Sequence, residues 1–240
     1  MRNICFYFQI HLPFLLKRYR FFEIGQDHYY YDDFQTEDRI RNVVEQSYLT
    51  ANRTISEMIR SSNGKFRCAF TISGLTLEQL EHYAPEVIDS FKELAKTGSV
   101  EFLAEPYAHS LSSVFDAEEF ERQVKMQADK IEALFGKRPT ALFNAELIYS
   151  DEIGKLVSKM GYKTMMIDEA KHIMGWKSPN YVYSHSYIPK LKLLVRNHKL
   201  SDDIAFRFSR LSLTAENYIS WISSLPQEEK VINLGMGYEV

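Results

Sequence analysis

A carboxylate and two histidines lie just beyond short apolar runs of the sequence, at points where they could do chemistry. Glu146 follows the apolar run 140–143 and precedes a helix start, His11 follows the run 4–10, and His109 follows a third such run. A carboxylate in this position can act as a nucleophile or as a general acid or base. The same residues have ordinary structural uses: Glu146 could complement a helix dipole, worth about 0.3 to 1 kcal/mol. His11 could be a hydrogen-bonded, partly buried residue, and His109 either a loop residue or a pocket wall.

Two further features could serve either in binding or in the structure of the protein. Glu101 lies inside the run 100–103. A carboxylate that faces a barrel interior is costly unless it is paired or binds something, which favours a function. The tyrosine run 29–31 and Trp176 could stack on sugar rings or could pack a loop onto the body of the protein.

The elements that must position these residues follow an alternating order. Short apolar runs alternate with longer helical patterns, which predicts a parallel sheet with crossover helices. The expected strands are 4–10, 66–72, 100–103, 140–143, 164–167, 193–196 and 231–234, with a weaker one at 181–187. Long irregular segments, 13–38 and 169–190, leave the first and fifth strands. Active sites of α/β barrels form at such exits, so we expect His11, Glu101 and Glu146 to face one mouth.

Several helix boundaries are also readable. Thr76 and Gln79 form a capping-box pattern, and Pro85 suits a first helical turn. Ser150 and Thr214 are expected N-caps, and Gly136 is an expected terminator. Because no repeat, charge block or linker interrupts the alternation, residues 1–240 are expected to form a single domain.

Composition excludes several classes of protein. The 240 residues are 45% hydrophobic and 25% charged, as in ordinary folded proteins, and the net charge of -3 gives no basic footprint for nucleic acid or an anionic membrane. The apolar runs are too short to span a bilayer, and the amino terminus lacks a signal-peptide pattern. The two cysteines, Cys5 and Cys68, have no zinc-like spacing. They are interpreted as free thiols, and we expect a cytoplasmic protein.

Four short segments together resemble a known family. Gln-Ile-His-Leu-Pro at 9–13, Gly-Ser-Val-Glu at 98–101, Asn-Ala-Glu-Leu-Ile-Tyr at 144–149 and Asn-Leu-Gly-Met-Gly-Tyr-Glu at 233–239 are similar to successive motifs of glycoside hydrolase family 57, the α-amylase and 4-α-glucanotransferase family. The resemblance covers essentially the whole chain. It implies an α/β fold of the glycoside hydrolase/deacetylase type, an incomplete (β/α)7 barrel of parallel strands. It also implies retaining chemistry on an α-glucan or maltooligosaccharide, with no metal or organic cofactor.

The resemblance assigns roles to particular residues and also shows a departure. It implies that Glu146 is the nucleophile and that His11, Glu101 and His109 line the sugar subsite beside the cleaved bond. Retaining chemistry needs a second carboxyl group about 5 to 5.5 Å away, and the family's acid/base Asp falls at Gly237, which cannot donate a proton. Leu12 replaces the Gln of the family's first motif. The helical region that follows the last strand in the family is missing from 1–240, so the chain resembles a truncated or degenerate member that should expose apolar surface.

Three interpretations of function follow. The first is a retaining α-glucan hydrolase or glucanotransferase that Gly237 impairs. The second is a non-catalytic glycan-binding pseudoenzyme or gene fragment. The third, a metal-dependent polysaccharide deacetylase, is disfavoured because no Asp-Asp with paired histidines at ligand spacing is present. A carboxylate opposite Glu146 would separate the first two, and Asp168 or Glu239 could supply it.

Overall fold

Parallel strands form the centre of the fold. The computed structural model describes residues 2–26, 28–208, 210 and 212–239. One sheet has the strand order β3-β2-β1-β8 and the other has the order β4-β5-β7-β6. All neighbouring strands are parallel except β6, which is antiparallel to β7. The strands are β1 Asn3–Ile10, β2 Cys68–Ile72, β3 Val100–Leu103, β4 Ala141–Phe143, β5 Thr164–Ile167, β6 Val182–Ser184, β7 Lys192–Val195 and β8 Val231–Gly237.

Two isolated parallel bridges join these sheets into a ring. Ala104 pairs with Leu142 between the ends of β3 and β4, and Arg196 pairs with Asn233 between β7 and β8. The ring order is therefore β1, β2, β3, β4, β5, β7, β8, with β6 outside it as an edge strand. The predicted barrel of seven parallel strands is confirmed, and single bridges at two seams make it weakly closed.

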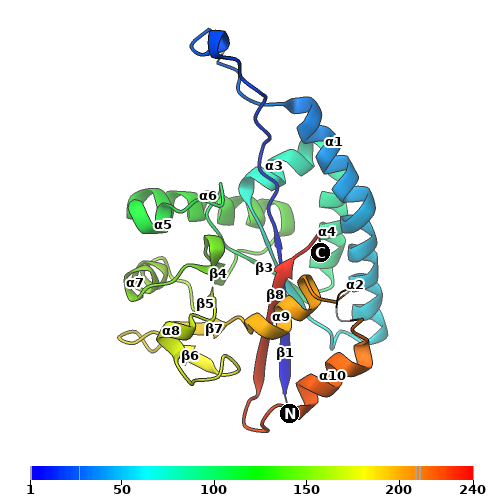
Figure 1. Cartoon of the computed structure of the whole chain (residues 1–240), viewed down its shortest axis with the longest axis vertical. Coiled ribbons are helices and arrows are strands. Elements are labelled where there is room, and N and C mark those ends of the chain that lie inside the picture. Colours follow the sequence, from blue (N-terminus) through cyan, green and yellow to red (C-terminus); the bar gives the residue numbers. More distant parts are fainter. Residues whose placement is uncertain (1, 27, 209, 211, 240) are drawn as a thin grey trace.

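Helices surround this ring and cover the outer faces of the strands. In Figure 1, β1 and β8 run side by side through the centre, with α1 and α2 on one side and α5, α6 and α7 on the other. The helices are α1 Asp33–Val43, α2 Leu49–Ser61, α3 Gly74–Tyr83, α4 Pro85–Lys96, α5 Ser112–Phe115, α6 Ala117–Phe135, α7 Asp151–Lys159, α8 Lys171–Met174, α9 His198–Ala205 and α10 Ala215–Ser224. A π-helical turn, Val44–Tyr48, joins α1 to α2, and short 3-10 turns span Phe21–Glu23 and Ala145–Leu147.

Most of the expected helix boundaries are confirmed, and one is wrong. Ser150 and Thr214 cap α7 and α10 through their side chains. Helix α3 does not begin at Thr76, because Ser73 directly after β2 is its N-cap and accepts from the Thr76 N–H. The Thr76 hydroxyl accepts from the Leu12 N–H instead, and Gln79 Nε2 donates to the Leu12 carbonyl. These bonds tie the exit of β1 to α3.

The interior of the barrel is packed with side chains. A buried cluster inside the ring comprises Tyr7, Ala69, Leu103, Ala141, Phe143 and Met166, contributed by β1 to β5. A larger cluster between β1 to β3 and helices α1 to α4 includes Phe70 and Phe91. Because side chains fill the ring, the amino and carboxyl ends of the strands open to separate surfaces.

Gly235 of β8 provides a stability prediction, because it lies against the Tyr7 ring. A Cβ at position 235 would lie 2.1 Å from Tyr7 Cζ. We expect Gly235→Ala to lower the free energy of unfolding by about 1 to 3 kcal/mol, measured by chemical denaturation. In a Tyr7→Leu background the same substitution should cost less. An equal cost in both backgrounds would show that the Tyr7 ring is not the cause.

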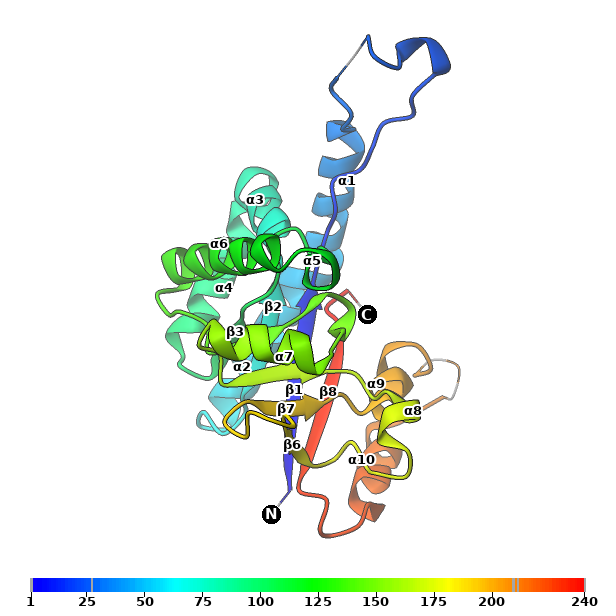
Figure 2. The ribbon, with the colours of Figure 1, turned by 90° about the vertical axis from the view of Figure 1, so that its left-hand side faces the viewer.

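The segment between β1 and α1 projects from the barrel as an arm. Its two limbs run antiparallel, with Lys17 N–H donating to the Tyr30 carbonyl at 2.9 Å, and Figure 2 shows it extending beyond α1. The side chains of Phe21 and Phe22 near its tip are 79% and 87% exposed. These exposed rings belong to the arm and not to the end of β8, so the predicted apolar surface beyond the last strand stays a prediction.

Candidate active site

A pocket of about 260 Å³ lies at the carboxyl ends of the strands. Its lining comes from the ends of β1, β4, β5, β7 and β8, which are far apart in the sequence. The lining residues are Tyr7, Gln9, Phe143, Glu146, Leu147, Asp168, Arg196, Phe206, Gly235, Met236 and Gly237. The predicted nucleophile and the position of the missing acid/base therefore share one pocket.

Glu146 reaches this pocket from an unusual turn. Glu146 and Leu147 have positive φ angles of 53° and 54°, a left-handed conformation that is costly for residues other than glycine. Asn144 holds the turn: its side chain accepts from the Ala145 N–H and donates to the Ile148 carbonyl. The Glu146 side chain is 72% exposed and is available to a ligand. Stored strain of this kind is typical of functional positions.

His109 lies beside Glu146 and is held by a buried carboxylate. Its Nε2 is 3.4 Å from Glu146 Oε1, and its Nδ1 is 2.7 Å from Glu105 Oε2. Thr71 Oγ1 donates to the other Glu105 oxygen at 2.6 Å, and Glu105 is fully buried. Burial raises the pKa of Glu105. Burial opposes protonation of His109, but the contacts with Glu105 and Glu146 outweigh it and raise the pKa of His109.

His11 stacks on His109 at the same mouth. The ring centroids are 4.5 Å apart, and His11 Nδ1 is 2.9 Å from the Ser73 hydroxyl. Burial, and then the charges of His109 and Arg39, lowers the pKa of His11 to about 4. His11 is therefore a neutral hydrogen-bonding group near pH 7, suited to a sugar hydroxyl.

Glu101 does not face this mouth, so the prediction of one mouth for His11, Glu101 and Glu146 is wrong for Glu101. Its carboxylate accepts from the Thr140 hydroxyl at 3.0 Å and lines a separate pocket with Cys5 and Lys137 at the amino ends of the strands. Burial, and then the charge of Glu101, raises the pKa of Cys5. Alternation along β3 turns Glu101 inward, as expected, but it lies at the start of the strand, below the packed interior.

Of the two carboxylates considered opposite Glu146, one lines the pocket. Asp168 follows β5 and is 3.8 Å from Arg196 Nη1, while Arg196 Nη2 donates to Asp202 at 2.7 Å. Glu239 instead accepts a hydrogen bond from the buried Tyr48 hydroxyl, outside the pocket lining. Asp168 follows β5, the strand next to β4, so it is adjacent to Glu146 in the order of the ring.

Gly237 lies across the ring from Glu146. It pairs with Gln9 of β1, whereas β4 leads into the Glu146 turn, and β5 and β7 separate β4 from β8 in the ring. Tyr7 is also among the lining residues, and its buried hydroxyl has no hydrogen-bond partner among the described residues. A ligand hydroxyl in the pocket could pair with it.

The aromatic residues considered for sugar stacking lie away from this lining. Trp176 is 93% exposed after α8, and the tyrosines 29–31 belong to the arm, where the Tyr29 hydroxyl donates to Asp33. None of them is among the described residues that line the pocket. Stacking on a bound sugar stays a prediction for them.

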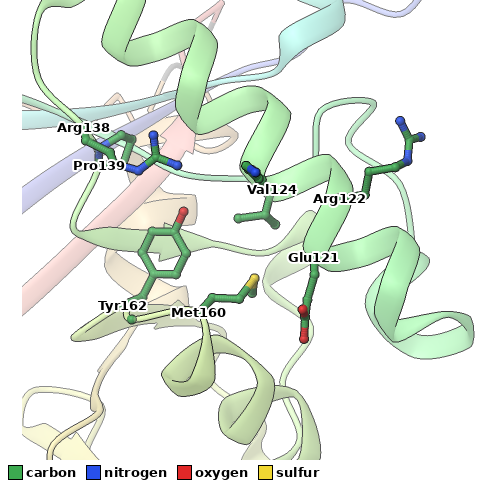
Figure 3. Close-up of a pocket in the computed structure, with 9 residues that line it drawn as sticks. Glu121, Arg122, Val124, Arg138, Pro139, Met160 and Tyr162 are labelled. Carbon is green, nitrogen blue, oxygen red and sulfur yellow. The ribbon is translucent and has the colours of Figure 1, made fainter.

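A larger pocket of about 460 Å³ lies elsewhere, beneath α6. Figure 3 shows its wall, with Val124 from α6, Arg138 and Pro139 before β4, and Met160 and Tyr162 after α7. Three of its charged side chains form surface ion pairs: Arg138 with Asp129, Arg122 with Glu119, and Glu121 with Lys159. This pocket is a groove between surface elements, without the strand-end carboxylates of the first pocket.

Two further observations concern metals and membranes. In the described parts of the chain, no group of three or more His, Cys, Asp or Glu side chains is arranged to hold a metal ion. No helix within those parts has the length and apolarity needed to cross a bilayer.

Sequence reasoning missed Glu105 as a site residue. Its signal was present, because Glu105 follows β3 by two positions and lies four positions before His109. In the structure His109, which contacts Glu105, has a left-handed backbone with a φ of 51°. The sequence does not predict this conformation.

Comparison with known proteins assigns the family. The chain is 36% identical to a putative alpha-amylase from Methanocaldococcus jannaschii over 98% of its own length, and it spans 51% of that relative. The crystal structure of a 4-alpha-glucanotransferase from Thermococcus litoralis superposes with a TM-score of 0.73 at 17% identity, over 99% of this chain and 33% of the other. A GH57-type branching enzyme from Pyrococcus horikoshii gives a TM-score of 0.71 at 13% identity, over 99% of this chain and 63% of the other. The pattern of glycosyl hydrolase family 57 matches residues 5–240, and the chain therefore belongs to that family.

Proposed function

We propose that this chain carries a retaining active site for α-glucans in which Glu146 is the nucleophile, and that Gly237 makes turnover of natural glucans slow. The observation that carries the proposal is the shared pocket, in which Glu146 on its strained turn lies across from Gly237. The relatives support the substrate class, since their names are those of an alpha-amylase, a 4-alpha-glucanotransferase and a branching enzyme.

In the first step Glu146 attacks the anomeric carbon of the bound sugar. A bond forms between a Glu146 oxygen and that carbon, and the glycosidic bond breaks with its electron pair on the leaving oxygen. The leaving oxygen of a natural glucan needs a proton, which a carboxyl group at position 237 would supply. Asp168 also lines the pocket, but it follows β5, which lies beside β4 in the ring, whereas Gly237 lies across from Glu146. His11 and His109 are proposed to contact the sugar held beside the bond.

In the second step water must displace Glu146 from the sugar. Water needs a base to accept its proton, and the same missing carboxyl group would provide it. The site should therefore form a glycosyl ester from a substrate with a good leaving group and should release it slowly. A pseudoenzyme that only binds glycans would form no such ester, which separates the two interpretations.

The test is to trap this ester. We expect 2,4-dinitrophenyl α-maltotrioside to give a burst of dinitrophenolate and a maltotriosyl adduct on the peptide that contains Glu146, detected by mass spectrometry. Azide should accelerate turnover and release α-maltotriosyl azide, because azide attacks without a base from the face on which an acid/base residue would lie. A protein that binds maltotriose yet yields neither adduct nor glycosyl azide would be a glycan-binding protein.

We propose a cytoplasmic setting for this activity. Cys5 and Cys68 are free thiols on neighbouring strands, and burial raises the pKa of both. Free thiols suit a reducing compartment.

A further inference from the structure

The imidazole of His109 connects a fully buried carboxylate to the proposed nucleophile. Glu105 binds one ring nitrogen, with Oε2 2.7 Å from Nδ1. The Thr71 hydroxyl donates a hydrogen bond to the other carboxylate oxygen of Glu105. The other nitrogen, Nε2, faces the pocket, 3.4 Å from Glu146 Oε1. Such an arrangement of carboxylate, imidazole and reactive group sets the orientation and protonation of the middle member.

The pocket-facing nitrogen, Nε2, has two partners that favour opposite protonation states of His109. Gln9 Nε2 is 3.1 Å from His109 Nε2, a contact that suits a neutral imidazole accepting from the amide. Glu146 Oε1 on the same nitrogen suits an imidazolium, whose Nε2–H can donate to a carboxylate. For the imidazolium, Gln9 must turn its amide oxygen toward the ring. The proton on Nε2 therefore decides whether His109 holds Gln9 or Glu146.

His109 is badly placed to replace the missing acid. A proton donor must face the leaving oxygen across the bond, about 5 to 5.5 Å from the nucleophile in retaining enzymes. The 3.4 Å contact instead puts His109 against the nucleophile itself. At this distance His109 can orient the carboxylate of Glu146, whose side chain is 72% exposed.

We propose that Glu105 is a positioning residue of this site, which orients the His109 imidazole and keeps it protonated so that its Nε2–H holds the Glu146 carboxylate in line for attack. This inference rests on the proposed function of Glu146 as nucleophile. It assigns a role to the buried Glu105 carboxylate, whose desolvation would otherwise be an uncompensated cost.

The groups around His109 determine the sign of the pH effect. The titratable neighbours are Glu105 after β3, Glu146 after β4 and His11 after β1, and the uncharged polar neighbour is Gln9 of β1. Burial opposes the imidazolium, whereas Glu105 and Glu146 favour it and outweigh burial. Removal of the Glu105 charge must therefore lower the pKa of His109. Protonated His109 then persists only up to a lower pH than in the parent. The decline in the rate of Glu146 attack at high pH should therefore begin at a lower pH.

The experiment compares Glu105→Gln with the parent. The His109 titration is followed by NMR of histidine-labelled protein without substrate, and the pH profile of adduct formation is followed with 2,4-dinitrophenyl α-maltotrioside. We expect both the His109 titration and the alkaline limb of the rate to move to lower pH, with the rate at the acid plateau retained. Glu229→Gln is the matched control, because Glu229 is a buried carboxylate bound to Asn180 near the start of β8 and should move neither.

Glu105→Asp provides the conservative variant and carries the test if Glu105→Gln does not fold. It keeps the charge but shortens the reach to His109, so its titration and alkaline limb should lie between those of the parent and of Glu105→Gln. An unchanged His109 titration, or a shifted titration with an unchanged rate profile, would overturn the role of Glu105. Absence of any adduct in the parent would overturn the proposed function and this role with it. The titration needs no substrate, so the two failures are distinguishable.

Discussion

Gly237→Asp should raise the turnover of maltooligosaccharides by about 10² to 10⁴-fold, the usual contribution of a general acid and base. The substitution returns a carboxyl group to the pocket across the ring from Glu146. Gly237 is the last residue of β8 and lines the pocket, so position 237 belongs to the same pocket as Glu146. The gain should be large for maltooligosaccharides and small for 2,4-dinitrophenyl glycosides, whose leaving group needs no proton.

Gly237→Asn is the matched control for this gain. Asparagine has nearly the shape of aspartate but neither donates a carboxyl proton nor accepts one as a base. Turnover of maltooligosaccharides, measured by release of reducing ends, should remain at the parent level in Gly237→Asn. If a folded Gly237→Asp protein is no faster than Gly237→Asn, position 237 is not the acid/base position of this chain.

The fold could be predicted from sequence because its signals are local. Most strands of the ring are short apolar runs separated by helical patterns, and this alternation predicts a parallel arrangement. Helix α3 shows where local signals fail. Thr76 and Gln79 match a capping box, but Ser73 lies closer to the end of β2 and takes the cap, while Thr76 and Gln79 bind the backbone of Leu12. Contacts between segments that are distant in the sequence outweighed the local pattern.

The candidate site could be predicted only in part, for a related reason. Glu146, His11 and His109 were identified because they follow strands, and the carboxyl ends of parallel strands converge. Glu101 lies on the inward face of β3 but at the start of the strand. The alternation of side chains along a strand shows which face a residue is on, but not which end of the barrel it is near. Glu105 was missed as a site residue because its partners, Thr71 and His109, meet it only through the turn after β3.

Glu146→Gln in the Gly237→Asp background should lower maltooligosaccharide turnover by about 10⁴-fold or more, as expected when a nucleophile is removed. The restored background matters, because the parent is expected to be too slow for a loss of this size to be measured. The amide keeps the shape of the side chain but is a very weak nucleophile, so the glycosyl adduct should also vanish. Retention of activity would assign the nucleophile to another residue, and Asp168 would be the first to test, since among the described residues it is the other carboxylate that lines the pocket.

The stereochemistry of azide products gives this prediction a second, independent outcome. Glu146→Gly suits the turn, because Glu146 has a φ of 53°, where glycine is unstrained. In Glu146→Gly with Asp at position 237, azide can enter only from the side that the Glu146 carboxylate leaves open, and an α-glycoside should give a β-glycosyl azide. The parent, which keeps Glu146 but lacks the acid/base, should give the α-azide through two displacements. Opposite configurations from the two proteins would require Glu146 and position 237 to act on opposite faces of the sugar, whereas the same configuration from both would contradict the nucleophile assignment.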